Sequence, residues 1–307
     1  MGAKFWFFYS AFFVFVFPLF FSFSGGFLSS PIWATISLCV GIIVWCIFIY
    51  KVYVRTIVQP LKTQRNIHRL LEDGKRVRGT VQDKVILLKK QQEDTEMLEI
   101  AVSFQNLEGT PVNKVFQFVD TKPHLKRYET GGTVDLRLSR TFQSPAVILA
   151  DTQTRFSWKI GFFACLFVVS YMLGTLAWHY ATFSNGHGWR FLSLWHPWLM
   201  TPYIGLLLLN IPVLLGGFFG SGGKDTEEKL LLFGKKTTAI VQRAEQTGTY
   251  INEQPQIRYI LKFTDDKGKE HVVTFKRVVS LTELHRVNVD TRDILYLPED
   301  PELLTFY

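Results

Sequence analysis

Three histidines form the group of side chains in this chain that is best suited to metal chemistry. His179, His187 and His196 follow one another at spacings of eight and nine residues. Imidazole nitrogens bind zinc and copper, but a metal site needs ligands held in a fixed geometry, and these spacings cross a loop that contains glycine. Nearby tryptophans favour the alternative that the histidines lie at a membrane–water interface. We therefore predict no metal site.

A second candidate is the glycine-rich stretch Gly220–Asp225, whose composition is similar to that of phosphate-binding loops. The first glycine of such a loop would fall on Phe218, and Asp225 stands where a Ser or Thr would hold magnesium. The stretch is better interpreted as a flexible linker. His124 and His271 have no Ser or Cys nucleophile motif near them. The sequence thus predicts no enzyme and no cofactor.

The fourth apolar stretch of the chain carries polar and helix-breaking residues. Pro202, Asn210 and Pro212 lie within it, and broken helices with a buried amide are found in transport sites. No Asp, Glu, Lys or Arg accompanies them to carry a proton or pair with a charged substrate. We expect a kinked helix instead, in which Gly216 and Gly220 allow close helix packing and Asn210 bonds a neighbouring helix. A transport or channel component remains the alternative.

Four stretches without any acidic or basic residue organise the whole chain. A bilayer core of about 30 Å is crossed by about 20 helical residues, so each stretch is long enough to span it. We predict four transmembrane helices arranged as two hairpins, within Phe5–Phe23, Pro31–Tyr50, Ile160–Phe183 and Phe191–Gly223.

Basic residues predict the orientation of these spans. Lys4 precedes the first span, whereas the loop Ser24–Ser30 has no charge and Arg190 is the only charged residue between the third and fourth spans. The positive-inside rule then places both termini and both long polar segments in the cytoplasm. We expect a multi-pass protein of the bacterial inner membrane.

The net charge of +8 is concentrated just after the second span. Pro60 is expected to break the helix there. Within residues 51–74 we therefore expect a short extension of the second span and then a basic amphipathic helix along the membrane surface. Anionic lipid headgroups would each attract such a side chain by about 1 kcal/mol. An arginine-rich groove with interleaved aromatics is missing, which excludes nucleic acid as a partner. The predicted headgroup contacts are Lys51, Arg55, Lys62, Arg65 and Arg69.

The two polar segments resemble each other. Apolar residues alternate with polar ones in both, as expected of strands with one buried face. They share leucine pairs, a Gly-Lys step and a Val-Gln step at an offset of 160, namely Leu70-Leu71, Gly74-Lys75 and Val81-Gln82 against Leu230-Leu231, Gly234-Lys235 and Val241-Gln242. We interpret this as a tandem duplication, in which each membrane hairpin is followed by a small cytoplasmic β-barrel or sandwich-like module. The predicted segments are 1–50, 51–74, 75–157, 158–223 and 224–307.

The end of the second module carries a recognisable signature. Tyr296, Pro298 and Pro301 stand in the run Asp293–Pro301, after an aliphatic strand and a glycine turn. Over residues 235–304 this pattern resembles the DUF3592 family of bacterial membrane-associated proteins. Ser139 and Arg140 depart from it in the first copy. The family is of unknown function, so the resemblance implies fold and membrane location but no catalytic residue.

Together these features predict a non-enzymatic integral membrane protein that presents two cytoplasmic modules to a protein partner. Its role would be that of a scaffold, a regulator or a protective, immunity-type binder. Small β-modules without catalytic groups commonly bind through loops or exposed strand edges. We expect the hairpin segment Leu88–Glu96 to contact the partner, and homodimerisation is left open.

Overall fold

The computed structural model of the chain describes residues 2–23, 28–90, 95–154, 156–219, 224–251, 253–287 and 289–307. The chain forms two compact units. One unit joins Met1–Lys62 to Arg155–Phe219, and the other joins Thr63–Thr154 to Gly220–Tyr307. Each unit therefore combines sequence from both halves of the predicted repeat.

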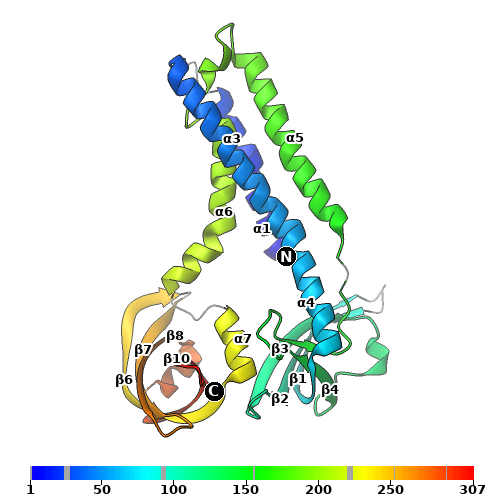
Figure 1. The fold of residues 1–307 in the computed structure, drawn as a ribbon, viewed down its shortest axis with the longest axis vertical. Coiled ribbons are helices and arrows are strands. Elements are labelled where there is room, and N and C mark those ends of the chain that lie inside the picture. Colours follow the sequence, from blue (N-terminus) through cyan, green and yellow to red (C-terminus); the bar gives the residue numbers. More distant parts are fainter. Residues whose placement is uncertain are drawn as a thin grey trace. The chain divides into compact units, whose positions relative to one another are not determined.

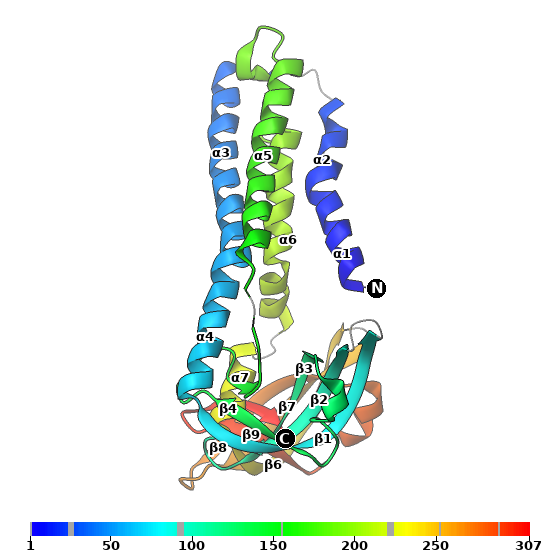
Figure 2. The ribbon, with the colours of Figure 1, turned by 90° about the vertical axis from the view of Figure 1, so that its right-hand side faces the viewer.

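Helices alone make up the first unit (Figures 1 and 2). Its elements are α1 (Gly2–Ala11), η1 (Phe12–Val16), α2 (Phe17–Phe20), η2 (Phe21–Phe23), α3 (Pro31–Tyr53), η3 (Val54–Val58), α5 (Trp158–Phe183), η5 (Gly188–Phe191) and α6 (Pro197–Phe219). Helices α3, α5 and α6 contact one another and lie side by side in Figure 2. Because apolar side chains cover these helices almost all round, they suit a lipid environment.

Two helices of the described residues are long and apolar enough to cross a membrane. They are the helical run Pro31–Asp73 and helix α5, Trp158–Phe183. Two further apolar helices, Phe5–Phe20 and Pro197–Ile211, are shorter. The structure thus bears out two of the four expected spans by length and composition, and the four-span arrangement stays a prediction.

The predicted helix break at Pro60 is wrong. Helix α3, η3 and α4 (Gln59–Asp73) form one helical run of 43 residues, Pro31–Asp73. Proline lacks an N–H and its ring clashes with the carbonyl one turn earlier in a regular α-helix. Here the residues just before Pro60 form the π-helical turn η3, whose wider hydrogen-bonded ring loosens the helix at that carbonyl. The run therefore passes through Pro60 without ending.

Tryptophans and glycines hold the helices of the first unit together. Trp45 is fully buried, and its Nε1 donates to the carbonyl of Trp198 at 3.1 Å. Trp198 Nε1 in turn donates to the carbonyl of Met172 at 3.0 Å. Gly41 and Gly205 leave room for the rings of Trp198 and Phe48, since an added Cβ at either glycine would lie 2.4 Å from the ring. Helices α3 and α6 thus approach closely.

Of the residues predicted to pack the fourth span, Asn210 forms its hydrogen bond within its own helix. Asn210 Nδ2 donates to the carbonyl of Leu206 at 2.7 Å, one turn earlier in its own helix. Gly216 lies within α6, and Gly220 lies outside the described residues. The amide is therefore satisfied within α6. Among the glycines whose surroundings the structure describes, Gly41, Gly161 and Gly205 allow close helix approach in this unit.

The second unit contains two five-stranded antiparallel sheets. The first sheet consists of β1 (Lys75–Lys90), β2 (Thr95–Gln105), β3 (Pro111–Asp120), β4 (Thr133–Leu138) and β5 (Val147–Leu149), with the short helix η4 (Pro123–Leu125). The second consists of β6 (Lys235–Ile251), β7 (Gln254–Thr264), β8 (Glu270–Val278), β9 (Thr291–Leu297) and β10 (Asp300–Phe306), with η6 (Leu281–Arg286) and, before β6, helix α7 (Lys224–Phe233). Figure 1 shows the second sheet curled on itself.

The two sheets have the same strand order, as expected of two copies of one module. The orders are β3-β2-β1-β4-β5 and β10-β9-β6-β7-β8, which become identical, read from opposite ends, when each strand is counted within its own module. The first strand of each sheet has a register shift directly after Val81 or Val241. Both valines face the core of their own sheet, Val81 buried and Val241 half-buried. The modules share this local irregularity as well as their topology.

The turn after the second strand has the same side-chain hydrogen bonds in both sheets. The side-chain oxygen Oδ1 of Asn106 accepts from the backbone N–H groups of Glu108 and Thr110, both at 3.0 Å. Asp265 Oδ1 accepts in the same way from Lys267 and Lys269, both at 2.9 Å. The glycine of each turn has positive φ, 76° at Gly109 and 79° at Gly268. Only glycine adopts this conformation without strain, which explains its presence in both copies.

The hydrophobic cores of the two sheets are joined through strand β9, which contributes side chains to both. Strand β9 is buried on both faces: Ile294 and Tyr296 pack into the second sheet's core, whereas Leu295 and Leu297 pack into the first sheet's core. Leucines of α7, Leu230 and Leu232, join them there. The strands of the two sheets lie within residues 75–149 and 235–306, and both sheets belong to a single compact unit with residues of α4.

Candidate functional site

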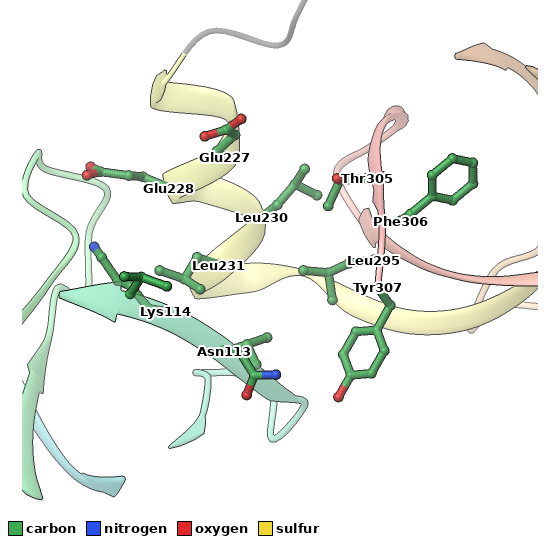
Figure 3. Close-up of a pocket in the computed structure, with 12 residues that line it drawn as sticks. Asn113, Lys114, Glu227, Glu228, Leu230, Leu231, Leu295, Thr305, Phe306 and Tyr307 are labelled. Carbon is green, nitrogen blue, oxygen red and sulfur yellow. The ribbon is translucent and has the colours of Figure 1, made fainter. Parts of the chain in front are cut away.

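The main candidate site in the second unit is a groove between the two sheets. It has a volume of about 470 Å³ and is bounded by β3, α7, β10 and part of β9 (Figure 3). We call it the edge groove and define it by its lining residues: Val112, Asn113, Lys114, Val115, Glu227, Glu228, Leu230, Leu231, Leu295, Thr305, Phe306 and Tyr307. Apolar side chains with a few polar groups are typical of binding sites.

Edge strands form two sides of this groove. Strand β3 is the last strand of the first sheet and pairs with β2, and β10 is the last strand of the second sheet and pairs with β9. The outer N–H and C=O groups of an edge strand can pair with a further strand. Tyr307 Oη donates to the carbonyl of Pro111 at 2.8 Å, so the ends of the two strands are linked. The groove thus offers backbone hydrogen-bonding groups along an extended edge.

Helix α7 places a carboxylate in the groove. Glu227 is exposed, whereas only 9 % of Glu228 is exposed. The Oε2 atom of Glu228 is buried and has no hydrogen-bond partner among the described residues. Figure 3 shows Lys114 reaching toward the same side of the groove, and its Nζ lies 3.4 Å from the carbonyl of Val147. An unpaired buried polar atom costs about 1–3 kcal/mol, and more if charged.

Hydrogen bonds connect α7 and the two sheets to one another beside the groove. Asn106 Nδ2 donates to the carbonyl of Gly234 at 2.8 Å, and the N–H of Leu107 donates to the carbonyl of Leu232 at 3.0 Å. Lys235 bridges the sheets, since its Nζ lies 2.8 Å from Asp266 and 3.5 Å from Glu108. Its hydrogen bond to Asp266 raises the pKa of Lys235, and the same contact lowers the pKa of Asp266. The groove therefore has a rigid frame.

A second polar cluster in the first sheet has the residue types of a catalytic site but not the space. Arg127 pairs with Asp120 at 2.6 Å and with Asp151 at 2.9 Å. Tyr128 donates to Asp151, and burial raises the pKa of Tyr128, assisted by that carboxylate. Asp120 is buried and also accepts from the N–H of Lys122 at 3.0 Å. These partners fix the crossing between β3 and β4, which is a structural role.

The histidines considered for a metal site lie in the first unit. His179 is buried, with its Nε2 atom 2.9 Å from Ser22 Oγ and its Nδ1 atom 2.6 Å from the carbonyl of Thr175. The rings of His179 and His196 are 4.7 Å apart, and His187 belongs to the loop before η5. In the part of the chain that the structure describes, no three His, Cys, Asp or Glu side chains gather to hold a metal ion.

The other predicted site residues are dispersed. All five basic residues expected to contact lipid headgroups are exposed, and Arg55 also donates to the carbonyl of Leu209 at 3.2 Å. Of the hairpin segment Leu88–Glu96, residues 91–94 lie outside the described part of the chain. Leu88 is 65 % exposed, whereas Glu96 is buried and paired with Lys89 at 2.9 Å. The glycines Gly220–Gly223 also lie outside the described residues.

Sequence reasoning missed the edge groove because its walls are far apart in the chain. The available signal was Glu227-Glu228 one residue before the leucines of α7, near the start of a short helix. No known protein family, curated protein or solved structure matches the chain. The fold itself defines two linked antiparallel sheets joined to apolar helices, and the resemblance to the DUF3592 family stays a prediction.

Proposed function

We propose that this protein is a non-enzymatic membrane protein that binds an extended segment of a protein partner in the edge groove. The observation that carries the proposal is the buried carboxylate of Glu228, unpaired at Oε2, beside the free edge of β3. An extended peptide that adds to β3 would satisfy the outer backbone groups of that strand. A lysine or arginine of the peptide would pair with Glu228, and its apolar residues would contact Leu230 and Leu231.

The proposal includes the membrane arrangement that the sequence predicts. The two long apolar helices support membrane association. We infer four spans in the bacterial inner membrane, both termini and both sheets in the cytoplasm, and headgroup contacts by the five exposed basic residues between Lys51 and Arg69. The amide of Asn210 is used within its own helix, which favours a packing role for α6 over the alternative of transport.

Reporter fusions check this arrangement. Fusions after Gly26, Arg140, Asn185 and Tyr307 are expected to report outside, inside, outside and inside, because basic residues stay on the cytoplasmic side of a bacterial membrane. An alkaline phosphatase and a fluorescent-protein fusion at each position provide opposite signals. Any other order would contradict the four-span arrangement and leave the edge groove in a different compartment.

Peptide selection tests the groove itself. A library of random linear peptides is displayed to the full-length protein in detergent, and the bound sequences are determined. We expect apolar sequences with one Lys or Arg at a constant position. Glu228→Gln should weaken their binding at least tenfold, since removing one partner of a buried charge pair costs about 2–5 kcal/mol. Asp225→Asn is the matched control, because it removes an exposed carboxylate of α7 that does not line the edge groove, and it should change binding less than threefold.

Stability measurements separate lost binding from lost folding. Glu228→Gln keeps the side-chain shape and removes a buried charge unpaired at Oε2, so its unfolding temperature should be no lower than that of the unchanged protein. Selected peptides without a basic residue, or with equal affinity for the Glu228→Gln protein, would exclude this site. A second copy of the chain in the groove would appear instead as a dimer that Glu228→Gln dissociates.

A further inference from the structure

At one end of the second sheet, two arginines occupy positions on the inner face of the sheet. On β8 the less exposed residues alternate from His271 through Phe275 to Arg277. Arg292 comes two residues before the buried Ile294 on β9, so both lie on the same side of that strand. The guanidinium carbons of Arg277 and Arg292 lie 5.6 Å and 4.4 Å from the ring centre of Phe306. Two cations thus gather on one aromatic ring.

The equivalent positions in the first sheet hold apolar residues. Arg277 pairs with Ile257 across the strands as Phe118 pairs with Leu98, and Arg292 pairs with Ala239 as Val134 pairs with Gly79. Val134 is buried in the first sheet's core, and Phe118 packs against it with its ring 4.8 Å from that of Tyr128. Apolar residues therefore fill these positions in one copy of the module, and arginines replace them in the other.

A cavity opens beside the two arginines. Its volume is about 510 Å³, and its lining includes Thr291 and Asp293. The Asp293 carboxylate is already held by Lys236 at 2.8 Å and by Thr238 at 2.9 Å. Arg277 has no ion pair with any of the described residues. Arg277 therefore brings to the cavity a positive charge that pairs with no described carboxylate, and the cavity volume is within the range of sites for small ligands.

We propose that this arginine pocket, defined by Arg277, Arg292, Thr291 and Phe306, binds the phosphoryl group of a phosphate-bearing ligand. Guanidinium groups offer planar pairs of N–H donors that match phosphate oxygens. Stacking on Phe306 limits the motion of both groups before a ligand arrives. The pocket adjoins the edge groove, with which it shares Phe306, but phosphate binding there does not depend on a protein partner.

Inorganic phosphate is the probe for the first test. It is titrated into the full chain in detergent at constant ionic strength, with heat of binding and unfolding temperature as readouts. We expect saturable binding and a raised unfolding temperature. The double variant Arg277→Phe, Arg292→Val carries the residues of the first sheet, so it should fold and bind phosphate at least tenfold more weakly. Arg277→Lys should lose several-fold, since it keeps charge but not the planar donors.

The control is Arg243→Val, which removes an arginine that is exposed on β6 and paired with Glu245. It should leave phosphate binding unchanged. The proposal is overturned if phosphate stabilises the protein no more than chloride at equal ionic strength, or if the double variant binds phosphate as well as the unchanged protein. If the double variant does not fold, the single variant Arg277→Phe takes its place in this comparison of phosphate binding.

A second arm identifies the source of the phosphoryl group. The titration is repeated in nanodiscs of phosphatidylcholine with and without phosphatidic acid. A lower apparent phosphate affinity in phosphatidic acid, absent in the double variant, assigns the pocket to a lipid headgroup. Equal affinity in both bilayers assigns it to a free phosphorylated compound.

Discussion

Replacing Asn106 with aspartate is expected to lower the free energy of unfolding by about 2–4 kcal/mol. Only 2 % of this side chain is exposed, and it connects the two sheets. Aspartate keeps the oxygen that accepts from Glu108 and Thr110 but loses the donor to the Gly234 carbonyl. A carboxylate oxygen would then face that carbonyl oxygen at about the former hydrogen-bond distance of 2.8 Å. The lost bond and the added repulsion act together.

The repeat supplies the control for this substitution. Asp265→Asn changes the equivalent turn residue in the second sheet, where Oδ1 bonds lie within the turn and Oδ2 lies 2.9 Å from His271 Nε2. We expect a smaller loss than for Asn106→Asp, because asparagine keeps the oxygen that accepts from Lys267 and Lys269. Both variants are compared by thermal unfolding in detergent near neutral pH. Equal losses would show that the Asn106–Gly234 bond does not hold the sheets together.

Replacing Gly41 with alanine is expected to destabilise the helical unit by about 1–3 kcal/mol. The added Cβ would lie 2.4 Å from the Trp198 ring, well inside van der Waals contact. Trp198 is buried and its Nε1 is held by the Met172 carbonyl, so the ring cannot turn aside without losing a hydrogen bond. Helix α3 would have to move away from α6 instead.

Gly174→Ala on α5 is the matched control. An added Cβ there meets nothing within 4 Å, so alanine should be neutral or stabilise the helix by up to about 1 kcal/mol. Unfolding of both variants is followed by titration with a denaturing detergent. Stability changes of the same sign in the two variants would mean that the contact between Gly41 and Trp198 does not limit the approach of α3 to α6.

Local patterns predicted the parts of this fold that depend on neighbouring residues. Period-two alternation placed the strands, and the Asp265–Gly268 turn was recognisable because its residue types satisfy their own backbone. The run Ile294–Leu297 has no charged residue and three aliphatic ones, which is typical of a strand buried on both faces. That run could have indicated that the two cores are joined, but its partners Leu230 and Leu232 lie more than sixty residues earlier.

Sites were harder to predict than strands. Pro60 is a helix breaker by local rules, yet a π-helical turn just before it accommodates the ring. The edge groove combines β3, α7 and β10, and its essential feature is an unpaired oxygen on Glu228. An inward arginine such as Arg292 looks like a surface residue until the strand register is known. Each of these properties depends on contacts between segments distant in sequence.

The joined cores have a consequence for how the chain is made. A ribosome completes strands β1–β5 long before it reaches Leu230, Leu232, Leu295 and Leu297, which fill the first sheet's core. Helices α5 and α6 are synthesised in between. The apolar surface of the first sheet therefore stays exposed until the later segments have been synthesised. Chains truncated before α7 are expected to be targets for chaperones and proteases. This core can be completed only after Leu297 has been synthesised.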